Sequence, residues 1–296
     1  MNTAPRKVDR IVSAHRQREG GGFIVRRPFP TAGLDGVDPF LLIDEMGPAD
    51  YGPGEAVGAP DHPHRGFETV TYMLEGAFEH EDSAGHRGKL WPGDVQWMTA
   101  GAGIIHSEMP STEIRTNGGR VHGFQIWVNL PAADKMMRPR YQELDAEHIP
   151  TARSEDGLAQ VKVVAGEALG VKAAIDTRIP IVFQDWTLEP GADVRVNVPP
   201  EERAMVYVFG GGVQVGATGD TVDDGQLALL GDGEALHLVN SGHETARFLL
   251  LAGAPINEPV ARYGPFVMNT EAELRQAFTD FRSGRMGEIT REAQVG

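Results

Sequence analysis

Residues 58–76, GAPDHPHRGFETVTYMLEG, join two closely spaced histidines to a run of strand-forming residues. Side chains two residues apart on an extended chain point to the same face, so His62 and His64 project together while Pro63 faces away and stiffens the segment. The following residues 67–74 are rich in β-branched and aromatic types, which favour a strand. The segment therefore predicts a β-scaffold that carries two imidazoles on one face.

A second pair of candidate ligands follows in GAGIIHSEMP (101–110), where His106 and Glu108 are again two residues apart. A lone histidine is more often a hydrogen-bonded core or surface residue than a ligand, but one metal site explains two pairs with matching spacing. Three neutral imidazoles and a carboxylate suit a first-row divalent ion with open coordination positions. The set is unlike the all-oxygen shell of calcium and is unsuited to copper(I).

Short strand-like runs separated by turn residues continue through the chain. The 37 Gly and 20 Pro residues punctuate these runs at intervals of roughly 8–12 residues, a pattern typical of β-sandwiches and barrels. The fold class is therefore predicted to be mainly β. Besides 67–74, we expect strands at 94–100, 123–130, 161–166, 181–188, 205–211, 225–230, 235–240 and 246–253.

Length and internal similarity favour two domains. The 296 residues exceed one domain of roughly 150 residues, although a single large all-β domain could reach this length. LEGAF and PGDVQWM in the first half have loose counterparts in VFGGGV and LGDGEALHL in the second, which indicates a duplicated barrel. We expect the seam in the polar stretch 131–160, with a metal-binding domain at 1–138 and a metal-free domain at 139–296.

One helix is expected near the C-terminus, within the second domain. Thr270 with Glu273 three residues later forms a capping-box pattern, and Ser283-Gly284 marks the end of the helix. An apolar stripe between these signals would dock against a barrel. The stripe consists of Leu274, Ala277, Phe278 and Phe281.

Composition excludes several classes of site. The chain has no cysteine, so disulfides, zinc-thiolate sites, iron–sulfur clusters and cysteine nucleophiles are ruled out. Its formal charge of −15 and short basic clusters argue against direct nucleic-acid binding. No apolar run approaches the about 18 residues of a membrane span, and the first ten residues carry no secretory h-region. We expect a cytoplasmic protein without membrane contact.

The other histidines lack a matching pair. His80 and His86 flank a polar turn and are expected to face solvent or to support the ligands, and His122 could line the same cavity. His237 and His243 have no histidine or glutamate two residues away, so a metal site is not expected in the second half.

The succession HPHRGFETVTYMLEG, PGDVQWMTAGAGIIHSEMP, QIWVNL and YGPFVMNT resembles the pirin family of the cupin superfamily, and the likeness runs from about residue 7 to 283. The resemblance implies two cupin (jelly-roll) barrels facing each other. It also implies one metal in the N-terminal barrel, held at the positions of His62, His64, His106 and Glu108. Glu68 occupies the place of the usual cupin carboxylate ligand, but in pirin-like proteins that role passes to Glu108.

For function, the resemblance points in two directions. Some members resemble quercetinases, which convert a flavonol and O2 to a depside and CO. Others resemble nuclear cofactors whose metal state gates a transcription factor, so a regulatory partner protein, including a metabolic enzyme, is the alternative. No basic localisation run is present, which favours the dioxygenase and a role in flavonoid metabolism. Iron(II) is the expected ion, with manganese, nickel, cobalt and copper as alternatives.

Roles within such a site follow from the same resemblance. Glu108 is the expected catalytic base for the flavonol 3-hydroxyl, because a carboxylate beside the metal is within reach of that proton. Trp97 and Phe124 could line a pocket for a flat substrate, although a place in the barrel core is favoured. The residues expected to orient the imidazoles are Glu68, Glu79, Glu81 and Gln125.

Overall fold

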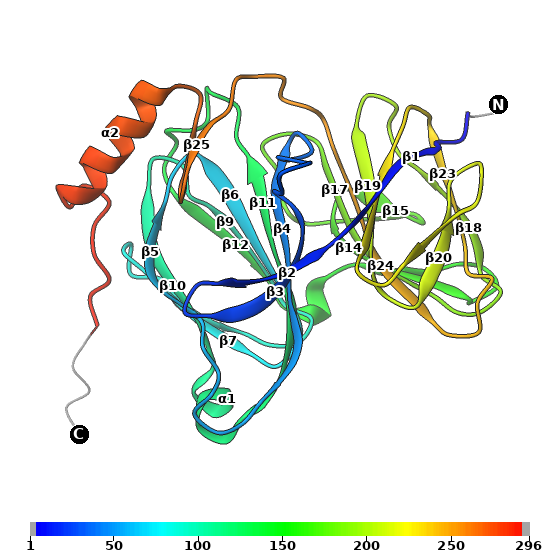
Figure 1. The fold of residues 1–296 in the computed structure, drawn as a ribbon, viewed down its shortest axis with the longest axis horizontal. Helices are drawn as coiled ribbons and strands as arrows, with labels where there is room; N and C mark the ends of the chain where they lie inside the picture. The colour runs from blue at the N-terminus through cyan, green and yellow to red at the C-terminus, as the bar shows by residue number, and fades with distance from the viewer. Residues whose placement is uncertain (1–3, 292–296) are drawn as a thin grey trace. The chain divides into compact units, whose positions relative to one another are not determined.

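The computed structural model describes residues 4–291, and their contacts divide the chain into two compact units. The first barrel, as we name it, consists of residues 16–26, 40–146 and 256–291, and the second barrel of residues 4–15, 27–39 and 147–255. Antiparallel strands dominate both units, which confirms the predicted mainly-β class (Figure 1). No helix in the described part of the chain is long and apolar enough to cross a membrane.

The first barrel consists of a seven-stranded and a four-stranded sheet. Thr71 in the large sheet and Glu108 in the small sheet lie within 2.7 Å of each other, so the two sheets face one another. A short helix, α1 (Thr112–Asn117), precedes β11. The large sheet has the order β12 (Arg140–Leu144), β9 (Val95–Thr99), β6 (Phe67–Glu75), β11 (Gly119–Asn129), β4 (Phe40–Tyr51), β3 (Phe23–Phe29) and β2 (His15–Glu19). The small sheet has the order β5 (Ala59–His64), β10 (Ile104–Pro110), β7 (Phe78–Asp82) and β8 (Arg87–Leu90).

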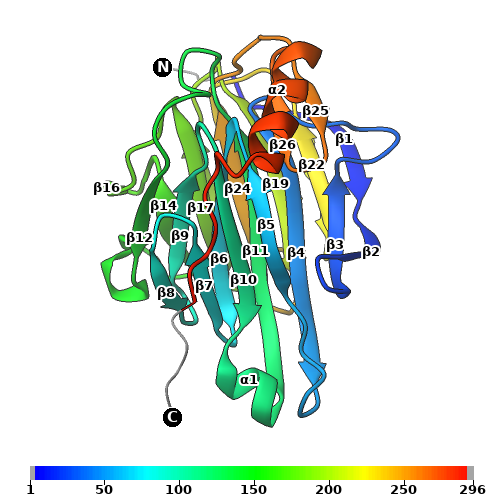
Figure 2. The same cartoon turned by 90° about the vertical axis from the view of Figure 1, so that its left-hand side faces the viewer.

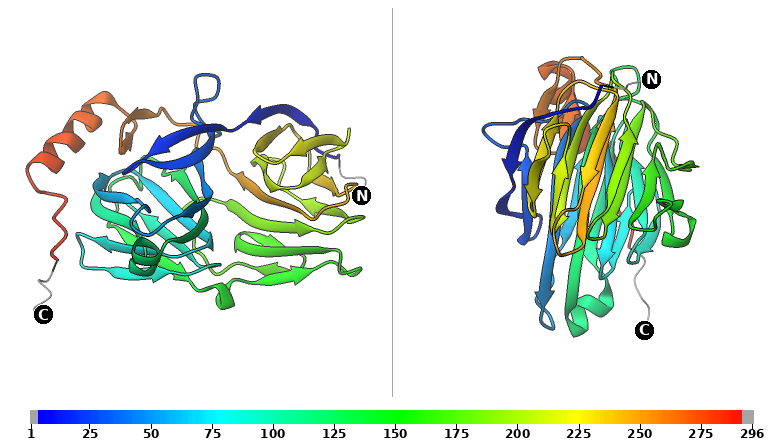
Figure 3. Two further views of the ribbon diagram at one scale, coloured as in Figure 1. Left: turned by 60° about the horizontal axis from the view of Figure 1, so that its bottom comes forward. Right: turned by 90° about the vertical axis from the view of Figure 1, so that its right-hand side faces the viewer.

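The second barrel likewise consists of one seven-stranded and one four-stranded sheet. Its strands are seen from two further sides in Figure 3. Its large sheet has the order β1 (Val8–Ser13), β22 (Gln226–Leu230), β19 (Arg203–Gly210), β24 (Ala246–Gly253), β17 (Ile181–Leu188), β14 (Ala159–Ala165) and β13 (Thr151–Arg153). Its small sheet has the order β18 (Asp193–Asn197), β23 (Ala235–Val239), β20 (Gly212–Val215) and β21 (Asp220–Asp223). The short strands β15 (Glu167–Ala168) and β16 (Val171–Lys172) form a separate hairpin, and the turn η1 (Ala146–His148) precedes β13.

Strand order confirms the suspected duplication. β5, β10, β7 and β8 of the first barrel occupy the places of β18, β23, β20 and β21 in the second. The central strands of the large sheets, β9-β6-β11-β4-β3 and β22-β19-β24-β17-β14, correspond in the same way. All nine predicted strands are present, with ends that differ by a few residues. The alternation of β-rich runs and Gly turns thus predicted the strands, whereas the two barrels were implied by the family resemblance.

The predicted division at 138/139 differs from the structure at both ends of the chain. Residues 4–15 belong to the second barrel, where β1 pairs with β22 at the edge of the large sheet. Residues 256–291, including the C-terminal helix, belong to the first barrel. The two terminal segments each join the barrel that is distant in sequence, and such long-range pairing leaves no local signal.

The C-terminal helix, α2 (Glu271–Arg282), follows the hairpin of β25 (Ala261–Tyr263) and β26 (Phe266–Met268) (Figure 2). Its predicted capping box is present. The Thr270 hydroxyl accepts from the Glu273 amide at 3.2 Å, and the Glu273 carboxylate accepts from the Thr270 amide at 2.8 Å. The pattern identified where the helix begins because capping is a local interaction.

A buried ion pair extends the packed face of α2. Asp280 is buried, whereas Phe281, predicted in the apolar stripe, is 36% exposed. Arg65 donates to the Asp280 carboxylate at 2.7 Å and to the Ala102 carbonyl at 2.6 Å. Hydrogen bonds from Arg65 and Arg285 hold the pKa of Asp280 at about 2, so the carboxylate is charged at neutral pH. The helix is thereby anchored next to the end of β5.

Lys135 fastens the same C-terminal segment from inside the first barrel. Its side chain is 1% exposed, and burial lowers its pKa to about 8. The ammonium donates three hydrogen bonds, to the carbonyls of Gly66 and Val267 at 2.7 and 3.0 Å and to the Asn129 side chain at 2.6 Å. Three acceptors from three parts of the chain are satisfied by one cation.

We predict that Lys135→Met destabilises the protein by about 2 kcal/mol or more, because buried acceptors left unpaired cost on the order of 1–3 kcal/mol each. Urea unfolding monitored by circular dichroism measures the loss. Lys7→Met removes an exposed lysine and serves as the control, which should change stability by less than about 0.5 kcal/mol. Equal stability of the two variants would contradict the role of Lys135.

Candidate metal centre

The candidate metal centre is built on the paired strands β5 and β10. Their antiparallel register places His106 opposite His62 and Ile104 opposite His64. The His62 ring centroid lies 4.6 Å from that of His64 and 4.4 Å from that of His106, and the remaining pair is 4.9 Å apart. One ring nitrogen of each histidine lies within 4.8 Å of the other two. The structure thus brings together the three histidines that the sequence paired in two separate motifs.

Backbone carbonyls orient two of these rings. Nδ1 of His62 lies 2.7 Å from the Pro60 carbonyl, and Nδ1 of His64 lies 3.4 Å from the Pro265 carbonyl. A carbonyl only accepts, so each Nδ1 carries the proton and each Nε2 presents a lone pair. The two Nε2 atoms lie 3.0 Å apart. Such an arrangement of lone pairs is favourable only around a cation or a shared proton.

His106 completes the donor set from the barrel interior. It is 1% exposed, and neither of its ring nitrogens has a hydrogen-bond partner. Burial and the neighbouring imidazoles hold the pKa of His64 and of His106 well below the ordinary value, so both rings are neutral at physiological pH. An unpaired buried imidazole costs free energy that coordination would recover. The residues therefore fit a divalent metal.

Glu108 lies beside the imidazoles and is held by its own hydrogen bonds. The Thr71 hydroxyl is 2.7 Å from Oε1 of Glu108, and the Gln125 amide donates to Oε2 at 3.2 Å. Among the residues that the structure describes, the compact ligand group contains only the three histidines, so Glu108 is positioned as a nearby carboxylate. Gln125 was an expected supporting residue, whereas Thr71 was missed although its place on β6 could have suggested it.

The other expected carboxylates are placed elsewhere. Glu68 accepts a hydrogen bond of 2.6 Å from Thr99, and it points to the opposite face of β6 from Thr71 because the two are three residues apart. Glu79 pairs with Arg115 at the surface, and Glu81 lies 3.3 Å from Arg291. These three residues do not orient the imidazoles through any hydrogen bond found in the described residues.

Similarity to known proteins identifies the family. The family model described as Pirin matches residues 22–128, and the Pirin C-terminal cupin domain matches residues 183–287. A pirin-like protein from Solanum lycopersicum is 46% identical over 284 residues, which cover 96% of this chain and 94% of that protein. The chain belongs to the pirin family. Pirin from Homo sapiens is 44% identical over 285 residues, which cover 95% of this chain and 94% of that protein.

A solved structure resembles this pirin-family chain over nearly its whole length. Quercetin 2,3-dioxygenase from Acinetobacter baumannii superimposes with a TM-score of 0.90 and is 38% identical, with coverage of 96% of this chain and 99% of that one. The expected bicupin fold and pirin membership are thereby confirmed.

Inward-facing positions of the second barrel are apolar where the first barrel carries its histidines. β18 and β23 correspond to β5 and β10, and the residues that they contribute to the core are Val194, Val196, Leu236 and Leu238. These side chains belong to one continuous hydrophobic core. His237 points outward on β23 and lies 2.7 Å from the Asp193 carboxylate.

Other histidines of the first barrel take part in separate contacts. His80, expected to face solvent or to support the ligands, is 4% exposed. Its Nε2 lies 2.8 Å from the Gln96 amide nitrogen and 3.1 Å from the Glu143 carboxylate. His122 lies 2.8 Å from the Glu45 carboxylate rather than among the ligands. The sequence placed His80 in a polar turn, but the structure places it in β7 with its side chain inside the barrel.

Some aromatic residues of the first barrel lie in its core, and others contact the candidate metal centre. Trp97 and Phe124 are fully buried, as the favoured interpretation had it. The rings that contact the centre are those of Phe67 and Trp127, whose centroids lie 5.1 and 5.2 Å from that of His64. These two rings limit the movement of the His64 imidazole.

We predict that His64→Ala lowers the metal content of the purified protein by about tenfold or more while the fold persists, because the barrels do not depend on one ion as a zinc finger does. Metal analysis and circular dichroism on the same preparation test this. His237→Ala, which removes a half-buried histidine of the second barrel, is the matched control and should keep its metal. Unchanged occupancy in His64→Ala would contradict the proposed centre.

Proposed function

We propose that this protein is a metal-dependent dioxygenase of the quercetinase type, which cleaves the heterocycle of a flavonol with O2 and releases CO. The observation that carries the proposal is the convergence of three imidazoles, two of them buried, beside a hydrogen-bonded carboxylate. The 38% identity to a protein described as quercetin 2,3-dioxygenase supports the same reaction. The proposed ligands are His62, His64, His106 and Glu108.

A bound divalent metal would supply a Lewis acid that favours the ionised 3-hydroxyl of the flavonol. Iron(II) is the proposed ion, because nitrogen and carboxylate donors with open positions are typical of non-haem iron oxygenases. Manganese, nickel, cobalt and copper are the ions to compare. The hydrogen bonds of His62 and His64 to Pro60 and Pro265 keep the two Nε2 atoms directed toward the metal position.

Glu108 is the proposed general base. The residue is 9% exposed, and its side chain lies on the same face of β10 as that of His106, beside the proposed metal position. The Gln125 amide and the Thr71 hydroxyl fix its orientation, so that an oxygen can take the 3-hydroxyl proton without first rotating. The base is thereby positioned before substrate binds.

One side of the site is more exposed than the others. His62 is half-buried, in contrast to His64 and His106, so the substrate would approach past His62. Trp127 lies on this barrel and is partly exposed, with the Arg262 guanidinium 4.9 Å from its ring centroid. A partly exposed indole beside the ligands suits contact with a flat aromatic substrate.

We predict that Glu108→Gln reduces metal content only modestly and reduces flavonol turnover by about 10²-fold or more, the scale of losing general-base assistance. Glutamine keeps the shape and one oxygen donor but barely accepts a proton. Glu68→Gln is the matched control, since Glu68 bonds to Thr99 on the other face of β6. Flavonol absorbance and metal content measured on one preparation separate the effects.

Two outcomes would redirect the assignment. Equal losses of metal and turnover in Glu108→Gln would make Glu108 a ligand alone. If wild-type protein loaded in turn with each of the five metals consumes no flavonol, the dioxygenase proposal fails. A metal-sensing regulatory protein would then be the better explanation, to be tested by metal-dependent capture of a transcription factor or metabolic enzyme.

A further inference from the structure

The second barrel contains a cavity of about 740 Å³ that is separate from the metal centre. It lies beside the β15–β16 hairpin, between residues 166–182 and 197–202. Its volume is in the range of small-molecule sites. Buried apolar side chains form part of the wall, among them Ile175, Ile181, Val182 and Val198.

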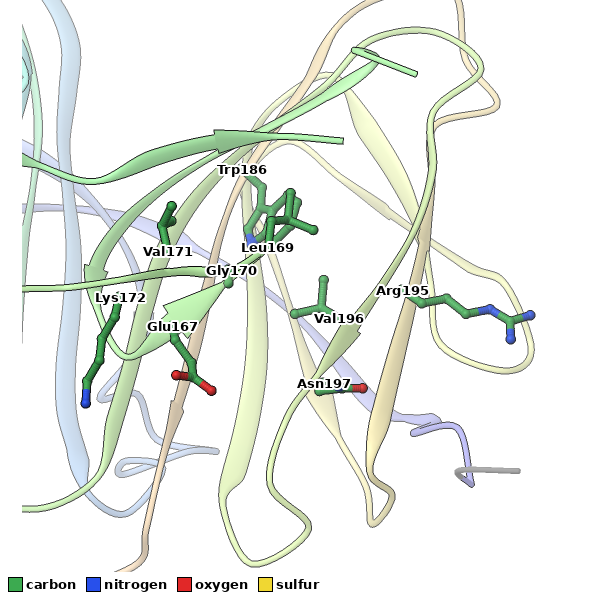
Figure 4. Close-up of a pocket in the computed structure, with 10 residues that line it drawn as sticks. Glu167, Leu169, Gly170, Val171, Lys172, Trp186, Arg195, Val196 and Asn197 are labelled. Atoms are coloured by element: carbon green, nitrogen blue, oxygen red, sulfur yellow. The ribbon is translucent and has the colours of Figure 1, made fainter. Parts of the chain in front are cut away.

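The hairpin separates this cavity from a neighbouring pocket of about 440 Å³, and Glu167, Lys172 and Asn197 line both. In the close-up of the smaller pocket, Glu167 and Lys172 extend to one side of the hairpin, away from Leu169 and Trp186 (Figure 4). Glu167 and Lys172 are exposed and thus stand at the rim of both pockets. Leu169 is also exposed, whereas Ala168 is buried.

Glu202 gives the cavity an unusual polar group. The residue lines the cavity and is only 6% exposed, yet its buried Oε2 has no hydrogen-bond partner. Arg6, the neighbouring buried cation, donates instead to backbone carbonyls, those of Pro199 at 2.6 Å, Glu202 at 3.0 Å and Gly231 at 3.0 Å. Burial raises the pKa of the Glu202 carboxyl. A buried carboxylate oxygen without a donor is costly, and a ligand that donates to it would recover that cost.

The charges around Glu202 select the sign of the ligand. Glu167, Asp176 and Glu234 also line the cavity, and Lys172 is the one cation among its lining residues. The four carboxylates outnumber the Lys172 ammonium and the nearby Arg6 guanidinium, which favours a positively charged guest, as does the net charge of −15 of the whole chain. The apolar wall favours a hydrocarbon or aromatic body attached to that charge.

We propose that this cavity binds a small amphipathic amine, whose ammonium group donates to Glu202 and whose apolar body packs against Ile181 and Val182. The site is independent of the metal centre, because all of its lining residues belong to the second barrel. The proposal does not rest on the dioxygenase assignment. It makes the second barrel a ligand-binding module without any metal ligand.

Three probes with one ring and different charges test the proposal by isothermal titration calorimetry on the full-length protein. They are phenethylamine, neutral 2-phenylethanol and anionic 3-phenylpropanoate. We expect phenethylamine to bind at least about tenfold more tightly than 2-phenylethanol, the scale of one charge-assisted hydrogen bond, and 3-phenylpropanoate not to bind. Equal affinities for the three probes, or no binding of phenethylamine at millimolar concentration, would overturn the proposal.

Variants locate the site. Glu202→Gln should weaken phenethylamine binding about tenfold or more, whereas Glu201→Gln, which changes the adjacent exposed carboxylate, should leave it within about twofold. Ala173→Phe places a ring in the cavity and should abolish binding even if Glu202→Gln disturbs the local fold. The metal-binding variant His64→Ala should bind phenethylamine normally. Loss of binding in His64→Ala, or unchanged binding in both Glu202→Gln and Ala173→Phe, would place the amine elsewhere.

Discussion

The candidate metal centre depends on the register between β5 and β10. Antiparallel pairing sets His106 opposite His62, and the two-residue period of each strand turns His64 and Glu108 to the same side. A slip of either strand by one residue would turn that strand's own pair of side chains to the opposite face of the sheet, so the three imidazoles would no longer meet. The turns that flank β5 and β10 and the large sheet that faces them hold the two strands in one register. They therefore also constrain the positions of the three histidines and Glu108.

The two barrels share one strand order, but the interior of the second is apolar at the positions where the first carries its histidines. In the second barrel, the positions of β18 and β23 that correspond to the ligand strands carry Val194, Val196, Leu236 and Leu238, which join a continuous apolar core. The first barrel gives up this contribution to stability, since its interior holds histidines, Glu108, Thr71 and Gln125. Burial of polar groups without partners opposes folding, and most of these groups are accordingly hydrogen-bonded to each other. Of the two related barrels, one thus has an apolar interior at these positions and the other carries the candidate metal centre.

The C-terminal segment, residues 256–291, completes the first barrel. Lys135 ties Val267 to Gly66, Arg65 pairs with Asp280 of α2, and the carbonyl of Pro265 orients the His64 ring. Two of these contacts involve the residues that directly follow His64 in the chain. The position of the C-terminal segment is therefore coupled to the geometry of the imidazoles. Because these contacts are hydrogen bonds and an ion pair, they fix specific orientations that apolar packing would not.

The β class, nine of the strands, the capping box of α2 and the three histidines of the candidate centre could be predicted from the sequence. Each of these rests on interactions within a few positions, such as strand alternation, turn chemistry and the reach from Thr270 to Glu273. Tertiary structure alone decided which barrel each terminus joins, that Glu68 faces Thr99 and Glu108 faces Thr71, and that His80 lies inside the barrel. It also decided that Pro265, 201 residues beyond His64, supplies a carbonyl to its ring, and that Glu202 is buried without a donor. Such contacts depend on how distant strands pair and on what each pair encloses, and a one-dimensional pattern carries no information about either.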